Sequence, residues 1–199
     1  MFKKINIDSF TINQEGLENK INEDCLWLCS FIEGELNQKK VLELGSGSGL
    51  ISIFIQKNFK VKEITSIEIE DKAFKSLNEN IKTNNCSNIK AYKYDIRNLK
   101  DSFKPNSYDL IITNPPFFKV GHGKQSINTQ RLLARHEILC NMTDIFDVSY
   151  SLLKSKGSFI FCYPQTRDNE VSLNAENFKF NIAEKKSKKN INFYCLIKD

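Results

Sequence analysis

Apolar residues recur along this chain with two spacings, one typical of helices and one typical of buried strands. The segment 22–32 has helix-spaced apolar residues at Leu26, Leu28, Phe31 and Ile32, which predicts a helix. From residue 39 onward, short strand patterns alternate with helix patterns. Strands are predicted at 39–45, 63–70, 89–95, 108–114 and 157–164, with helices at 48–58, 71–84 and 142–157, the last ending at Gly157. The tail adds two strands, at 177–186 and 190–199, with no helix between them.

The order of these elements predicts the fold class. Alternating strands and helices form parallel βαβ units, so we expect an α/β fold with a mostly parallel seven-stranded sheet and helices on both faces. The final two strands predict an antiparallel hairpin at one edge. Neither a linker nor a break in composition divides the 199 residues. Residues 1–199 are therefore expected to form one domain, with a polar segment and helix over 1–38 and a core over 39–199.

Composition narrows the class of protein without indicating a function. Hydrophobic residues make up 40% and charged residues 27%, which is ordinary for a globular domain. The net charge of +5 fits an anionic partner and a plain Lys-rich surface equally well. The longest apolar runs fall far short of the roughly 20 residues that span a bilayer. The first residues also lack a signal-peptide pattern, so we expect a cytoplasmic protein with no membrane segment.

The cysteines predict packing rather than metal binding. The six cysteines form no Cys-x-x-Cys pair, and only two His residues accompany them. Buried reduced thiols are the favoured interpretation, and no metal is expected. Cys25 and Cys29 are four residues apart in the first predicted helix, where a shared packing face explains both.

A glycine-rich turn joins the first core strand to the next helix. Gly45, Gly47 and Gly49, with Ser46 among them, lie where a doubly wound sheet binds a cofactor at the carboxyl ends of its strands. Glycines let such a turn be tight and let a ligand approach its backbone closely. Glu43 precedes the first glycine by two residues. A carboxylate there suits a cation better than a pyrophosphate, and S-adenosylmethionine carries a sulfonium and an ammonium group.

Acidic side chains end the next two predicted strands. Glu68 is the expected partner of a ribose diol, because one carboxylate can accept hydrogen bonds from both hydroxyls. Glu70 and Asp71 begin the following helix, where acidic residues favour the helix dipole. Asp95 ends the third strand, and two interpretations stay open for it: a hydrogen bond from an adenine amino group, or a turn.

The fourth strand ends in a stiff corner formed by Asn114, Pro115, Pro116 and Phe117. Pro115 has a fixed φ and no N–H, and Pro116 restricts it to an extended conformation. The carbonyl of Pro115 is therefore expected to point in one direction.

Taken together, "VLELGSGSG", "SIEIE", "YD" and "DLIITNPPF" resemble a class I S-adenosylmethionine-dependent methyltransferase. The resemblance implies a Rossmann-like fold and S-adenosylmethionine as the cofactor. In that family the Asn-Pro-Pro-Phe tetrapeptide marks enzymes that methylate a planar amide or an aromatic amine. The segments "ARHE" (134–137) and "INEDCLWL" (21–28) resemble the bacterial tRNA (adenine-N6)-methyltransferases, which modify the adenine just 3′ of the anticodon in a valine tRNA.

This resemblance assigns roles to the corner and the cofactor turn. The Asn114 side-chain oxygen and the Pro115 carbonyl would accept the two N–H groups of an adenine amine and aim its lone pair at the methyl group. Phe117 would stack on the base. The expected catalytic residues are Asn114, Pro115, Pro116 and Phe117, and the expected cofactor-binding residues are Glu43, Gly45, Ser46, Gly47, Gly49, Glu68, Asp95 and Asn114.

A basic segment follows the corner and predicts contacts with tRNA. The expected substrate-binding residues are Phe118, Lys119, Lys124, Arg131 and Arg135. A solvated loop explains Lys124 about as well, and Phe118 fits an extension of the base platform or the core equally.

Two alternatives compete with a tRNA methyltransferase. An N5-glutamine methyltransferase of peptide release factors shares the corner, but it usually carries a helical N-terminal domain. The segment before residue 39 is short for such a domain, and the basic segment favours RNA. A non-catalytic RNA-binding module with this fold is the other alternative, and the presence of Asn114, Glu68 and the glycines argues against it.

Overall fold

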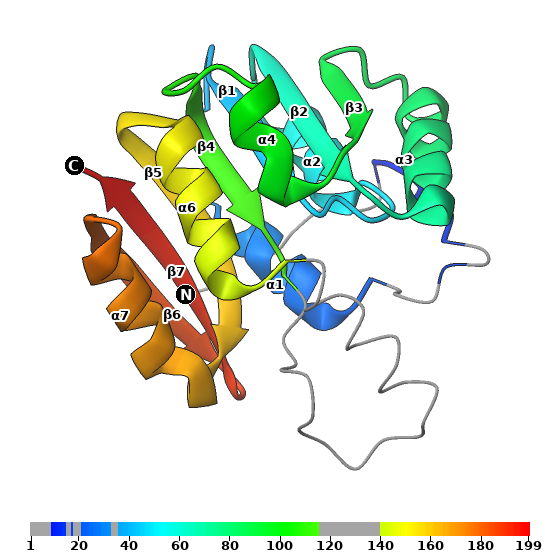
Figure 1. Cartoon of the computed structure of the whole chain (residues 1–199). Coiled ribbons are helices and arrows are strands. Elements are labelled where there is room, and N and C mark those ends of the chain that lie inside the picture. The colour runs from blue at the N-terminus through cyan, green and yellow to red at the C-terminus, as the bar shows by residue number, and fades with distance from the viewer. Residues whose placement is uncertain (1–8, 15–16, 18–20, 33–35, 116–139) are drawn as a thin grey trace.

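The computed structural model in Figure 1 describes residues 9–14, 17, 21–32, 36–115 and 140–199. One seven-stranded sheet runs through it in the order β3-β2-β1-β4-β5-β7-β6. Strands β1 to β5 pair in parallel, and β7 is antiparallel to both of its neighbours. The strands are β1 Lys40–Leu44, β2 Glu63–Glu68, β3 Ile89–Lys93, β4 Tyr108–Thr113, β5 Leu153–Pro164, β6 Phe180–Lys188 and β7 Ile191–Lys198. The predicted fold class is confirmed.

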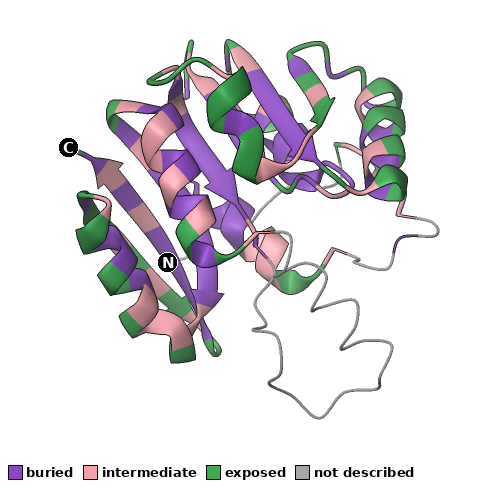
Figure 2. Cartoon of the chain, in the orientation of Figure 1, coloured by how far each residue is buried: buried purple, intermediate pink, exposed green. Residues whose placement is uncertain are grey.

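Helices cover both faces of the sheet because successive strand residues point to opposite sides. Val41 and Leu110 pack in one cluster with α1 and α2, whereas Leu42 and Ile111 pack in a second cluster with α6 and α7. The central strands are accordingly buried on both faces (Figure 2). The α-helices are α1 Glu23–Phe31, α2 Leu50–Asn58, α3 Asp71–Thr83, α4 Leu99–Ser102, α6 Met142–Leu152 and α7 Asp168–Asn177.

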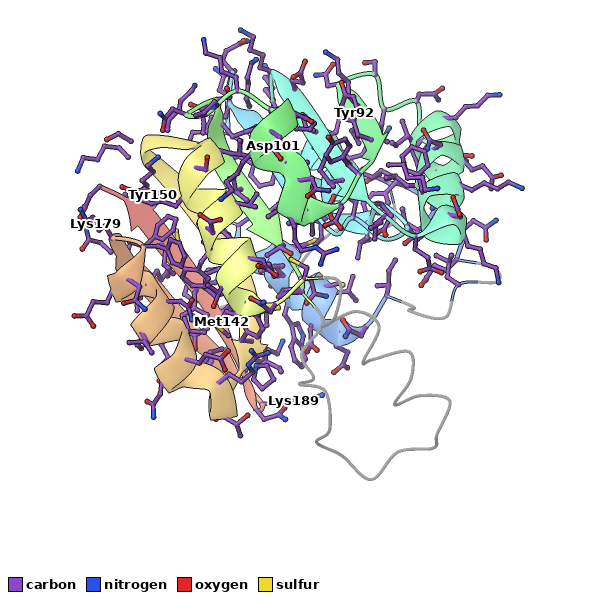
Figure 3. The ribbon with its side chains drawn as sticks, in the orientation of Figure 1. Tyr92, Asp101, Met142, Tyr150, Lys179 and Lys189 are labelled. Atoms are coloured by element: carbon purple, nitrogen blue, oxygen red, sulfur yellow. The ribbon has the colours of Figure 1, made fainter. Side chains whose placement is uncertain are left out.

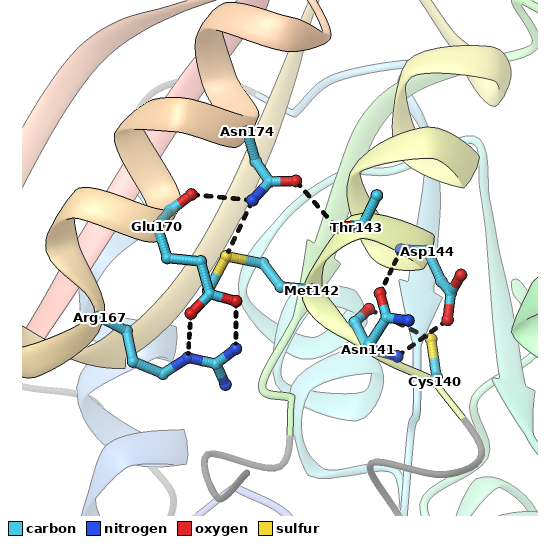
Figure 4. A network of polar contacts seen from close by, with 8 residues as sticks. All are labelled: Cys140, Asn141, Met142, Thr143, Asp144, Arg167, Glu170 and Asn174. Atoms are coloured by element: carbon cyan, nitrogen blue, oxygen red, sulfur yellow. Dashed lines mark hydrogen bonds and ion pairs between the residues drawn. The ribbon is translucent and has the colours of Figure 1, made fainter.

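Asparagine side chains cap the N-termini of α1 and α6. Asn22 accepts a hydrogen bond from the backbone N–H of Cys25 at 3.1 Å, which begins α1. At α6, the Asn141 side chain accepts from the N–H of Asp144 at 3.0 Å, and the Asp144 carboxylate accepts from the N–H of Asn141 at 2.9 Å. Figure 4 shows this reciprocal pair. The caps fix where the chain enters each helix.

The predicted helix over 142–157 is shorter than expected, and its last residues belong to the sheet. Helix α6 ends at Leu152, and β5 begins at the next residue by pairing with Tyr108 of β4. Lys156 turns the chain with a φ of 62°. A Cβ on Gly157 would lie 2.7 Å from Cγ of Leu153 and 2.9 Å from the Lys154 carbonyl oxygen. Gly157 therefore lies where the chain packs closely against Leu153 and Lys154 inside an irregular strand. It does not end a helix.

Helix α7 is an element that the sequence pattern did not predict. Its buried side chains include Val171 and Ala175, but the third is Asn174, so the apolar spacing is interrupted. Asn174 donates to the sulfur of Met142 at 3.6 Å and accepts from the Thr143 hydroxyl at 3.2 Å (Figure 4). These bonds satisfy a buried amide at the α6–α7 contact, which is how a polar residue occupies a core-facing position. The short helices η1 Ile96–Asn98, η2 Gln165–Arg167 and α4 were also not predicted.

Neither a membrane-spanning helix nor a metal-binding cluster is found among the described residues. Within them, no helix combines the length and apolar character needed to cross a bilayer. Nor do three His, Cys, Asp or Glu side chains in that part of the chain gather as a possible metal site. The six cysteines all lie in the described part and are free thiols.

Candidate active site

The predicted site residues gather at one edge of the sheet because parallel strands end on the same side. Leu44, the last residue of β1, pairs with Ile67 of β2 and Thr113 of β4. The Thr113 hydroxyl also donates to the Leu44 carbonyl at 2.8 Å. The glycine turn after β1 and Asn114 after β4 are therefore neighbours, with the end of β2 on the other side of the turn.

The glycine turn borders open space at Gly45 and Gly47 and is tightly packed at Gly49. Gly45, Gly47 and Gly49 have φ angles of 70°, 54° and 90°, in the region that favours glycine. A Cβ on Gly45 or Gly47 would meet no atom within 4 Å, whereas a Cβ on Gly49 would lie 2.5 Å from Cδ1 of Leu77. Ser46 is buried, and its N–H donates to the Ile67 carbonyl at 2.9 Å. The first two glycines thus border space that a ligand can enter, and the third permits packing against α3.

Glu68 holds the glycine turn to the end of β2. Its carboxylate accepts from the N–H of Gly47 at 2.7 Å and from the N–H groups of Ile69 and Glu70 at 2.8 Å each. A carboxylate offers about four lone-pair positions, so three are engaged by backbone here. Closing the turn is a role that the sequence did not predict, and the bond to a ribose diol stays a prediction.

Glu43 is buried beneath the turn and ties α2 to the sheet. Its carboxylate accepts from the N–H of Ser52 at 3.1 Å and from the Ser52 hydroxyl, which in turn lies 2.6 Å from the Ser66 hydroxyl. Burial raises the pKa of Glu43 to about 7, although the hydroxyls of Ser52 and Ser46 act in the opposite direction. The carboxylate therefore holds the first turn of α2, directly after the glycine turn, and a direct contact with the ligand stays a prediction.

Asp95 lies just beyond β3 and begins η1. Its carboxylate accepts from the N–H of Arg97 at 2.9 Å and pairs with the Arg97 guanidinium at 2.6 Å. The Arg97 side chain holds the pKa of Asp95 below its usual range. These contacts are those of a turn-forming residue, and the contact with adenine stays a prediction.

Asn114 places its carboxamide between two thiols. Its Nδ2 lies 2.7 Å from the sulfur of Cys25 in α1, and its Oδ1 lies 3.1 Å from the sulfur of Cys162 in β5. Pro115 is buried next to it. The other residues predicted for the corner and the basic segment lie outside the described residues: Pro116, Phe117, Phe118, Lys119, Lys124, Arg131 and Arg135.

Two asparagines of α3 join the N-terminal segment to the glycine turn. Asn80 donates to the carbonyls of Ser48 and Asn13, each at 2.9 Å, and accepts from the N–H of Asn13 at 2.9 Å. One turn later, Asn84 accepts from the N–H of Thr11 at 3.0 Å and donates to its carbonyl at 2.7 Å. A sequence signal was present at Asn80, because asparagine is a poor choice for a helix interior unless its amide has a partner, whereas Asn84 is the C-cap of α3.

The family described as Methyltransferase small domain matches residues 18–191. The chain belongs to this family. The family and the fold imply an S-adenosylmethionine-dependent enzyme, and the open space beside Gly45 and Gly47 fits a cofactor at the usual place for such a sheet. A solved structure of a ribosomal protein L11 methylase from Lactobacillus delbrueckii subsp. bulgaricus shares the fold, with a TM-score of 0.67 and 19% identity over 90% of this chain and 81% of that one.

Curated relatives of this methyltransferase small domain carry a more specific name. The chain is 28% identical over 170 residues to a tRNA1(Val) (adenine(37)-N6)-methyltransferase of Trichodesmium erythraeum, covering 84% of this chain and 70% of that protein. It is 33% identical over 156 residues to a protein of the same name from Glaesserella parasuis, covering 78% of this chain and 63% of that protein. The chain thus spans about two thirds of the length of these relatives.

Proposed function

We propose that the chain is a tRNA (adenine-N6)-methyltransferase that modifies the adenine just 3′ of the anticodon. The observation that carries this proposal is the position of Asn114 and Pro115 at the end of β4, beside the glycine turn at the end of β1. An amide acceptor beside the cofactor turn is the arrangement needed to hold a planar amine against a methyl donor.

The chemistry asks the protein to orient a weak nucleophile. The lone pair of an adenine amino group is delocalised into the ring, and S-adenosylmethionine supplies a methyl group on a sulfonium. Asn114 Oδ1 and the Pro115 carbonyl accept the two N–H bonds, which directs the lone pair out of the base plane. Holding the amine in line with the methyl group is the main source of the rate enhancement. The base must leave its stack to enter the site, and an unpaired anticodon-loop base does so at low cost.

Two further observations favour tRNA as the substrate. The relatives that match over most of this chain are named for tRNA1(Val) adenine 37. The turn between β6 and β7 also carries Lys188 and Lys189 at the same edge of the sheet as Asn114, because Pro164 at the end of β5 pairs with Ile191 at the start of β7. Cations at that edge suit a phosphate backbone. A tRNA substrate agrees with the cytoplasmic location expected from the sequence.

The test offers the purified chain a choice of substrates. Labelled S-adenosylmethionine is incubated with the protein and either unmodified valine tRNA or a peptide release factor, and the products are analysed as nucleosides or peptides. N6-methyladenosine at the position 3′ of the anticodon is the expected product. Label on a release-factor glutamine and none on tRNA would replace this proposal with the alternative that shares the corner.

A further inference from the structure

The strongest unexplained feature of the site is the pair of cysteines around Asn114. Cys25 belongs to the first turn of α1, and Cys162 lies in β5 directly beside the end of β4, where Phe161 pairs with Thr113. In Figure 1, α1 lies close to the end of β4, and the bond from Asn114 to Cys25 connects the two elements. Each end of one carboxamide therefore contacts a thiol from a different element.

Both thiols are protonated and neutral, so they can hydrogen-bond to the Asn114 amide without placing a charge beside it. Burial raises the pKa of Cys25 to about 11, and it raises the pKa of Cys162 well above the usual range. A neutral thiol has one S–H donor and a weak acceptor. In the observed arrangement the Cys162 S–H donates to Oδ1 at 3.1 Å, and the Cys25 sulfur accepts from Nδ2 at 2.7 Å.

We propose that Cys25 and Cys162 are positioning residues that clamp the Asn114 carboxamide and hold its Oδ1 toward the substrate amine. An amide oxygen has two lone pairs, so one remains for the amine after Cys162 has taken the other. A carboxamide held at both ends does not rotate about its terminal bond, which has broad and shallow preferences when unrestrained. This inference rests on the proposed function for the identity of the amine and on the contacts for the clamp itself.

The clamp can be tested with variants of nearly equal volume. Cys162→Ala removes the donor, and Cys162→Ser restores one; Cys25→Ala and Cys25→Ser form the second pair. Cys29→Ala is the matched control, since Cys29 is a buried thiol of the same helix that belongs to the same apolar cluster as Cys162. Loss of one neutral hydrogen bond predicts a fall in kcat of about three- to tenfold in either Ala variant, with KM for tRNA and cofactor affinity unchanged. The Ser variants are expected to recover much of that loss.

A second readout is independent of turnover. The side-chain NH₂ signals of Asn114 in a ¹⁵N–¹H spectrum are identified as the pair missing from Asn114→Ala. They are expected to shift in Cys25→Ala and Cys162→Ala and to stay in place in Cys29→Ala. Unshifted signals in both Ala variants, or an unchanged kcat in both, would overturn the clamp. If the wild-type protein transfers no methyl group to tRNA, the proposed function fails, and the NMR result still decides the clamp.

Discussion

Glu68 holds the glycine turn by backbone hydrogen bonds and is also the expected partner of the cofactor ribose. Its carboxylate accepts three backbone hydrogen bonds, including one from Gly47 in the turn. Hydrogen bonds to a charged group contribute about 1.5–3 kcal/mol each, so their loss loosens the turn as well as removing the predicted ribose partner. We expect Glu68→Ala to raise the cofactor Kd by at least about tenfold, measured by calorimetry.

The matched control for that variant is Glu70→Ala, which removes a neighbouring carboxylate at the start of α3. The Glu70 side chain makes no capping bond to the helix. Its loss should therefore leave the cofactor Kd nearly unchanged. Equal affinities of wild type and Glu68→Ala would contradict the role given to Glu68.

The raised pKa of Glu43 predicts that the stability of the fold falls as pH rises. Its pKa rises from an ordinary 4.5 to about 7 in the fold, chiefly through burial, so the folded state binds the proton more tightly than the unfolded chain does. The contribution of this tighter proton binding to the free energy of unfolding is present in full below the unfolded-state pKa. It is lost as pH rises through the folded-state pKa. Glu43→Gln removes this titration. The unfolding free energy of wild type relative to Glu43→Gln should therefore fall between about pH 5 and about pH 8 in urea titrations, and parallel profiles would count against it.

Site residues that directly follow strand ends could be predicted from the sequence. Contacts that depend on how helices pack against the sheet could not. The glycines, Glu68 and Asn114 follow strand ends, and strand ends of a parallel sheet share an edge. Cys25 precedes that sheet in the chain, and its contact with Asn114 depends on where α1 packs. No local pattern around "EDCLWL" indicates that contact.

Among the elements, α3 couples the N-terminal segment to the glycine turn through Asn80. Replacing Asn80 by Ala removes a partner of the buried Ser48 carbonyl and its bonds to Asn13, whose carbonyl keeps the Ser76 hydroxyl at 2.8 Å. Buried groups left unsatisfied cost about 1–3 kcal/mol. We expect Asn80→Ala to lower Tm by several degrees and to weaken cofactor binding severalfold.

Asn78→Ala is the matched control on the same helix. The Asn78 side chain is exposed and donates to the Phe74 carbonyl one turn earlier. Calorimetric scans of the two variants should therefore separate, with Asn78→Ala close to wild type. Coincident Tm values and affinities for wild type and Asn80→Ala would refute the coupling.

The central strands β1, β2 and β4 were predicted more reliably than the helices because each is a short apolar run buried on both faces. The boundary between α6 and β5 was missed because Leu152 and Leu153 are both fully buried and continue the apolar spacing of the helix. Helix α7 was missed because Asn174 occupies a core-facing position through bonds to Met142 and Thr143, which lie outside its own helix. Tertiary contacts, which local sequence patterns do not show, set both the α6–β5 boundary and the position of α7.

For the molecule as a whole, the antiparallel β7 brings a cationic turn to the edge where the site lies. Lys188 and Lys189 lie over the ring of Trp27 in α1, with Nζ 4.4 Å and 4.9 Å from its centroid. Lys189 also pairs with Glu23 at 2.6 Å. Figure 3 labels Lys179 at the left and Lys189 lower in the view, as expected for residues at the two ends of β6.

This arrangement predicts that the β6–β7 turn contributes to tRNA affinity. The double variant Lys188→Ala/Lys189→Ala should raise KM for tRNA severalfold and reduce the salt dependence of binding, because fewer counterions are released. Cofactor affinity should not change. The control is Lys104→Ala/Lys179→Ala, which removes the same charge from exposed positions away from this edge. Equal effects of the two double variants would indicate a general charge effect instead of a local surface.

The architecture was predictable because the alternation of strands and helices leaves few topologies for a sheet of this size. The composition of the site was predictable only in part. The expected cofactor-binding residues follow from the glycine turn and two acidic residues, whereas the contact of α1 with Asn114 arises from packing.

The most direct test of the whole account is methyl transfer by Asn114→Ala. Single-turnover transfer from labelled S-adenosylmethionine to valine tRNA is measured alongside cofactor affinity for wild type and variant. We expect transfer to fall by at least about a hundredfold while the cofactor Kd stays within severalfold, because Asn114 is proposed to hold the amine and the glycine turn remains intact. Transfer by Asn114→Ala at the wild-type rate would contradict it.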